Sequence, residues 1–128
     1  MSRKNISSGA PWEATVGYSR AVKVGNLIFV AGTTATNFDG EIVGIGNAYE
    51  QAVFVLKKIE TALKEADASF KNVVRTRIFV KNMDDWESIG RAHGEVEVRA
   101  RVSVVVVEVS RFIHNDILVE IEVDAVID

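Results

Sequence analysis

The sequence predicts an α+β fold: one domain over residues 1–128, with a mixed β-sheet and two helices on one face of the sheet. Strand-like and helical patterns follow one another in the order β-β-α-β-α-β-β, without a repeat, linker or low-complexity segment. A chain of 128 residues can bury a core without disulfide bonds, and this chain has no cysteine. In ARVSVVVVEVSRF, residues 100–112, apolar side chains leave both faces of one strand.

The first two strands form a hairpin. The β-rich runs YSRAVKV and LIFVAG meet at a Gly-Asn pair, which tolerates the positive φ of a tight turn. After a glycine-rich loop, Asn47 precedes Glu50 at the capping-box spacing, which predicts the start of a helix. The apolar residues of that helix recur at steps of one, three or four and should pack on the sheet: Ala48, Ala52, Val55, Leu56, Ile59, Leu63 and Ala66.

The second half of the chain repeats the alternation of strand and helix. NVVRTRIFV, residues 72–80, predicts a strand, and the spacing of Asp84 and Glu87 predicts a capping box that starts a second helix. The last strand, residues 118–126, alternates strictly, so one of its faces should meet the helices. That face carries Val119, Ile121, Val123 and Ala125, and the other carries Glu120, Glu122 and Asp124.

The valine-rich strand needs cover on its second face. Two helices cover only one face of a sheet, so we expect another copy of the chain to cover the rest. The two rows of this strand are Val102, Val104 and Val106, and Val105 and Val107. Two alternatives stay open: a central strand that is hydrophobic throughout, and a solvated acidic face on the last strand of a monomer.

Composition argues against several functional classes. A net charge of -3 and a pI near 5.4 are unlike a nucleic-acid-binding surface, so we expect no nucleic-acid partner. No apolar run approaches the roughly 18 residues that span a bilayer, and the polar N-terminus is unlike a signal peptide. We therefore expect a cytoplasmic protein without a membrane partner. His93 and His114 lie in no zinc-ligand pattern, so no metal site is predicted, and His93 is expected on a helix surface.

Five segments resemble the RidA/YjgF family of reactive-intermediate deaminases. They are GYSRAVKVGNLIFVAG, GEIV, LKEADAS, NVVRTRIFVKNMDDWESI and VEVSRF…DILVEIEVDAV, and together they extend from about Gly17 to Val126. The resemblance implies a chorismate-mutase-like fold and a homotrimer whose sheets line an inner core, with small-molecule clefts between subunits. It also implies hydrolysis of 2-imino and 2-enamino acids to 2-keto acids and ammonia, with no metal or organic cofactor.

The resemblance also implies the residues of the site. Glu120 matches the family's glutamate, which helps to hold the attacking water together with a backbone carbonyl, here that of Val106. Tyr18 matches the family's pocket tyrosine, and these two are the expected catalytic residues. The expected ligand-binding positions are Gly32, Val104, Val105 and Val106. Arg20 is expected to bind the ligand as well.

One departure from the family affects the chemistry directly. Val104 stands where typical members carry an arginine, and valine offers neither donor nor charge to a substrate carboxylate. Ala31 and Gly90 replace a serine and an asparagine. Arg20, two residues from Tyr18 in a predicted strand, is the best candidate for a replacement cation, and a solvent-facing charge is the alternative. Two functions stay open: an imine or enamine deaminase that anchors its substrate differently, and a non-catalytic trimer that binds a small ligand or regulates a partner.

Overall fold

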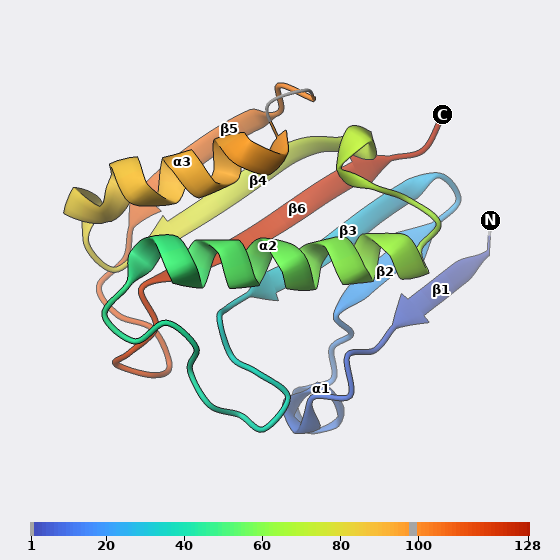
Figure 1. Ribbon diagram of the computed structural model, residues 1–128. Coiled ribbons are helices and arrows are strands. Elements are labelled where there is room, and N and C mark those ends of the chain that lie inside the picture. Colours follow the sequence, from blue (N-terminus) through green and yellow to red (C-terminus); the bar gives the residue numbers. More distant parts are fainter. Residues whose placement is uncertain (1, 98–99) are drawn as a thin grey trace.

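The computed structural model describes residues 2–97 and 100–128 and has the expected α+β class (Figure 1). The strands are β1 (Arg3–Ile6), β2 (Ala21–Val24), β3 (Leu27–Thr33), β4 (Val73–Val80), β5 (Ser103–Glu108) and β6 (Val119–Val126). The α-helices are α1 (Pro11–Val16), α2 (Ala48–Glu65) and α3 (Trp86–Glu97), and the 3₁₀ turns are η1 (Phe70–Asn72) and η2 (Met83–Asp85).

The strands form one mixed sheet in the order β1-β2-β3-β6-β4-β5. Neighbouring strands are antiparallel except β4 and β5, which are parallel because α3 carries the chain back between them. The valine-rich strand β5 is therefore an edge strand. Its apolar character cannot be explained by a central position in the sheet, so that alternative is wrong.

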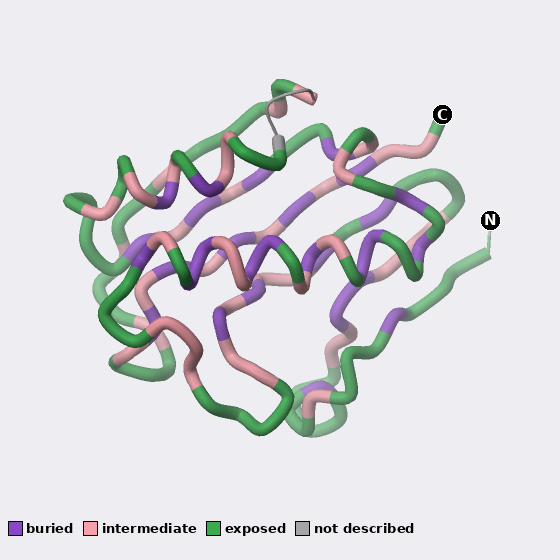
Figure 2. Tube along the Cα trace, in the orientation of Figure 1, coloured by how far each residue is buried: buried purple, intermediate pink, exposed green. Residues whose placement is uncertain are grey.

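Helices α2 and α3 lie side by side on one face of the sheet, and the other face is open (Figure 1). Every residue of the predicted α2 stripe is buried, as are the alternate residues of β6 that face the helices (Figure 2). The periodicity of 3.6 in the helix and of 2 in the strand thus predicted the core correctly. No helix among residues 2–97 and 100–128 combines the length and the apolar character that a bilayer crossing requires.

One of the two predicted helix starts is confirmed. The side chain of Asn47 accepts a hydrogen bond from the Glu50 backbone N–H at 3.0 Å. The capping box at Asp84 is wrong, because the side chain of Asn82 accepts from the Asp84 N–H at 2.9 Å and starts η2, which runs into α3. Asparagine and aspartate are both good N-caps, and the sequence offers both within three residues.

The strand β1 and the short helix α1 were not expected from the sequence. Strand β1 pairs with β2 at the sheet edge, and only Ile6 in it is buried, so its alternation is too short to recognise. Helix α1 starts at Pro11 and ends at Gly17, whose φ of 86° lies in the left-handed region that glycine adopts freely.

The register of β5 assigns its valines to faces. Val106 lies opposite the buried Ile78, so it points toward the helices, and it packs partly against the core. Val104 is on the same side and is 50% exposed. Val105 and Val107, 49% and 39% exposed, point to the open face. In a single chain, water therefore reaches valines on both faces of this edge strand.

Candidate functional site

A cleft of about 330 Å³ lies on the open face of the sheet. Strands β3, β4 and β6 form its floor, and the segment that follows β5 forms its rim. Its volume is at the lower end of those that hold small metabolites. The lining residues are Gly32, Phe79, Val109, Arg111, Phe112, Glu120 and Glu122.

Glu120 lies against Gly32 in this cleft. A Cβ atom at position 32 would come within 2.7 Å of the Glu120 carboxylate, so this approach requires glycine. Because the Glu120 side chain is half-buried, desolvation raises the pKa of its carboxyl; Arg20 lowers this pKa and Glu122 raises it further. Glu120 is thus a carboxylate with increased basicity, in contact with an open cleft.

Arg20 lies behind the cleft rather than in it. Its side chain is buried, and Nη2 donates a hydrogen bond to the Gly32 carbonyl at 2.6 Å. The guanidinium is 5.6 Å from the centre of the Tyr18 ring. The expected proximity of Arg20 to Tyr18 is found, but Tyr18 precedes β2, so a shared strand face is not the reason. The alternative, a solvent-facing charge, is wrong.

Lys58 supports the chain that follows β3. From α2, its Nζ donates hydrogen bonds to the carbonyls of Thr34 at 2.9 Å and Thr36 at 2.8 Å. Desolvation, with a smaller contribution from nearby Arg20, lowers the pKa of Lys58 to about 8. No sequence pattern indicated this role, because a lysine outside the apolar stripe of a helix normally faces solvent.

Tyr18 lines a second, wider hollow of about 710 Å³ on the same face. Ala31, which replaces the family's serine, lines it too, and Glu122 lines both hollows. Arg77 forms the wall, with ion pairs to Glu122 at 3.4 Å and Asp124 at 3.2 Å. Tyr18 and Glu120 therefore lie in adjacent hollows of one chain, not in the same one.

The β5 positions lie apart from Glu120 within one chain. Strand β4 separates β5 from β6, so the backbones of Val106 and Glu120 are about 9–10 Å apart at the usual strand spacing. Val104 and Val105 are on the same edge strand and line neither hollow. The structure thus brings Glu120, Gly32 and Arg20 together, with Tyr18 adjacent and the β5 positions apart.

Arg111 and Phe112 line the cleft although no pattern singled them out. Both follow β5 in an irregular segment, where periodicity does not predict side-chain direction. Their only signal was membership of the run VEVSRF, which carries part of the family resemblance. Among the described residues, no three His, Cys, Asp or Glu side chains gather as a metal site.

His93 does not lie on the helix surface as expected. Its Nε2 is 2.8 Å from the Thr76 Oγ1 on β4, and desolvation lowers the pKa of the half-buried imidazole. His93 therefore connects α3 to the sheet.

The sequence profile of the Endoribonuclease L-PSP family matches residues 8–127. The chain belongs to this family, also known as the RidA/YjgF family. A RutC family protein from Pyrococcus abyssi is 39% identical over 106 residues, 82% of each chain. The 3-aminoacrylate deaminase RutC from Acinetobacter baylyi is 29% identical over 104 residues, which cover 81% of this chain and 82% of the relative.

A solved RidA/YjgF structure agrees closely with the fold. Rv2704 from Mycobacterium tuberculosis, described as a member of the YjgF/YER057c/UK114 family, is 40% identical to this chain. The two superpose with a TM-score of 0.89 over 98% of this chain and 100% of the other. The mixed sheet with helices on one face is thus the family fold.

Proposed function

We propose that this chain is a deaminase that hydrolyses small 2-imino or 2-enamino acids to 2-keto acids and ammonia. The observation that carries the proposal is Glu120, a half-buried carboxylate of raised pKa that faces an open cleft beside Gly32. The chemistry is supported by a relative named as a 3-aminoacrylate deaminase, whose name denotes an enamine that carries a carboxylate.

Glu120 serves as the general base in the proposed reaction. It accepts a proton from water as the water oxygen bonds to the imine carbon. It then returns this proton to the nitrogen, which gives a carbinolamine. In a second transfer Glu120 takes the hydroxyl proton of the carbinolamine and passes it to the nitrogen as the C–N bond breaks, so that a C=O bond forms and ammonia leaves. An enamine substrate enters this sequence as its imine tautomer. A carboxylate with a pKa above its ordinary value is a stronger base and, once protonated, an acid nearer to its working pH.

The assembly is a homotrimer in this proposal, with the ligand cleft completed between subunits. The exposed valines of β5 support it, since an edge strand with apolar side chains on both faces is uncommon in a monomer. The strand order also supports it, because β4 separates the backbone of Val106 from that of Glu120 within one chain.

The second candidate function is a non-catalytic trimer that binds a small ligand. Val104 favours it, because a site that lost the family's arginine has lost a charged, bidentate contact to the substrate carboxylate. Such a protein would bind a metabolite in the cleft and leave it unchanged.

An ammonia assay separates the two functions. The substrates are 2-iminopropanoate and 2-iminobutanoate, generated freshly in the assay, and ammonia and keto-acid release is compared with a protein-free blank. Deamination predicts rates that rise in proportion to protein concentration. Rates equal to the blank, from protein that binds the keto acids, would establish the binding function instead.

A further inference from the structure

The lining of the cleft includes one positive and one negative side chain, Arg111 and Glu120, that form no ion pair with each other. Arg111 is exposed on the rim, and its guanidinium forms no hydrogen bond or ion pair with the side chains that the structure describes, those of residues 2–96 and 100–128. Glu122 is paired with Arg77 at 3.4 Å, whereas Glu120 has no ion pair within the same described ranges. The cleft thus offers a ligand one available cation, Arg111, and one available carboxylate, Glu120.

The apolar residues of the cleft indicate that its ligand also has an apolar part. Phe79, Phe112 and Val109 line the space together with these two charges. A molecule that satisfies all of them carries an anionic group, a nitrogen or polarised carbon, and a short apolar side chain. Its volume is limited by a cleft of about 330 Å³.

The segment that carries Arg111 is fastened at both ends. At its start, the Val109 N–H donates to the Val80 carbonyl at 2.9 Å. At its far end, the buried Gln51 of α2 donates to the Asp116 carbonyl at 2.8 Å and accepts from the Leu118 N–H at 2.9 Å.

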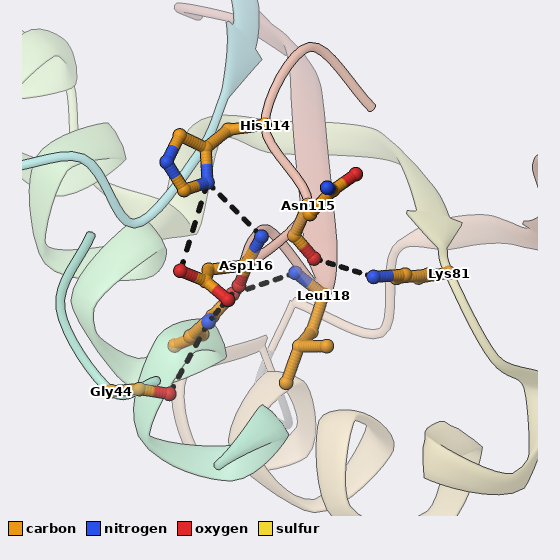
Figure 3. Close-up of polar contacts among 7 residues, drawn as sticks. Gly44, Lys81, His114, Asn115, Asp116 and Leu118 are labelled. Carbon is orange, nitrogen blue, oxygen red and sulfur yellow. Dashed lines mark hydrogen bonds and ion pairs between the residues drawn. The ribbon is translucent and has the colours of Figure 1, made fainter. Parts of the chain in front are cut away.

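Further contacts, drawn in Figure 3, strengthen the far end. Lys81 donates to the Asn115 carbonyl, and the His114 Nδ1 accepts from the Asp116 N–H at 3.0 Å. Gln51 also donates to the Gly44 carbonyl at 3.2 Å, which connects the segment to the loop before α2. A charged side chain on a fixed segment loses less conformational entropy on binding than one on a free loop.

Arg20 is poorly suited to the same role. It is buried, does not line the cleft, and already donates to Gly32 at 2.6 Å. To reach a ligand, its guanidinium would have to give up the contact that supports the floor of the cleft. Arg111 needs no such rearrangement.

We infer that Arg111 binds the carboxylate of the ligand in this chain and so replaces the arginine that Val104 displaced. This inference rests on the proposed function for the class of ligand, a 2-imino or 2-enamino acid and its 2-keto acid product. A guanidinium recognises a carboxylate through two parallel N–H···O bonds, so Arg111 also selects against neutral analogues.

Calorimetric titration with 2-oxobutanoate and with its neutral methyl ester tests the inference. The unmodified protein binds the acid more tightly than the ester. Arg111→Gln weakens binding of the acid at least about tenfold and leaves the ester unchanged, and Arg111→Lys, which keeps the charge but not the fork, falls between. The matched control is Lys57→Gln, which removes one positive charge from the exposed face of α2 and leaves both affinities unchanged.

The inference is overturned if the acid binds no better than the ester, or if Arg111→Gln binds the acid as tightly as the unmodified protein. Thermal unfolding checks that each variant is folded, and Arg111→Lys repeats the test if Arg111→Gln is unstable. Binding that depends on Arg111 without imine turnover would reject the deaminase and keep this inference. Imine turnover that is the same in Arg111→Gln as in the unmodified protein would support the deaminase and reject the role of Arg111.

Discussion

At the scale of single residues, Glu120 and Gly32 show which features of the site could be predicted from the sequence. The family resemblance placed both in a ligand site, and the structure finds them in contact on one cleft. The alternation of β6 put Glu120 on the face away from the helices but could not show that it is half-buried. Its burial depends on the neighbouring strand β3. A local sequence pattern does not show that β3 lies next to β6.

Arg20 and Arg111 could not be ranked from the sequence. Arg20 seemed the better cation because of its spacing from Tyr18, yet it is buried beneath Gly32. Arg111 lies in an irregular segment, where spacing carries no information about direction. Only the positions of both guanidinium groups relative to the cleft distinguish their roles.

Glu120→Gln is predicted to raise the thermal unfolding midpoint at pH 7. Burial raises the folded-state pKa of Glu120 above 4.5, so its ionised form is less favourable in the folded protein than in the unfolded chain. This cost is fully present above the folded pKa and disappears as the pH falls through 4.5. Calorimetry across this range should therefore show a gain at pH 7 that vanishes in acid; a lower midpoint at pH 7 would contradict the account.

His93 is predicted to make the protein less stable as the pH falls. Burial lowers the folded-state pKa of His93 below 6.5, so the unfolded chain binds a proton first. The stability is complete above 6.5 and decreases as the pH falls toward the folded pKa. Urea unfolding at several pH values should show this slope, and His93→Gln, which can still hydrogen-bond to Thr76, should reduce it. An equal slope in His93→Gln would exclude His93 as the cause.

At the scale of elements, long periodic patterns were predicted well and short ones were not. The stripe of α2 and the alternation of β6 specify their buried faces because they extend over 18 and 8 residues. Strand β1 and helix α1, with 4 and 6 residues, contain too few buried positions to form a pattern. The Asp84 cap failed for a different reason, since Asn82 starts the η2 turn two residues earlier and accepts from the Asp84 N–H itself.

Strand β5 exposes valines on both of its faces in the single chain, which supports the proposal that another copy covers it. Val107→Glu should weaken the assembly, because it places an unpaired carboxylate in the proposed apolar interface at a cost of several kcal/mol. Light scattering at micromolar concentration should then give a smaller mass than for the unmodified protein. Thr61→Glu, which adds the same charge on the exposed face of α2, should leave the mass unchanged. An unchanged mass in Val107→Glu would place this valine outside the interface.

At the scale of the whole molecule, the core lies on one face of the sheet and the candidate site on the other. The helices bury most of one face, and the open face carries the two hollows, the acidic row of β6 and the exposed Val105 and Val107. A sequence predicts the helix-covered face, since that core forms within one chain. It does not predict which residues would complete the open face in the proposed trimer, because local periodicity contains no information about contacts between chains.

The most direct test of the account is kcat/KM for 2-iminobutanoate hydrolysis in the unmodified protein and in Glu120→Gln, with the mass measured in the same samples. The account predicts a mass about three times the 14.1 kDa of one chain. It also predicts turnover above the blank, and a loss of at least about 100-fold in Glu120→Gln, as expected for removal of a general base. Glu60→Gln, on the helix-covered face, should react like the unmodified protein. Equal kcat/KM in Glu120→Gln and the unmodified protein would contradict the central claim.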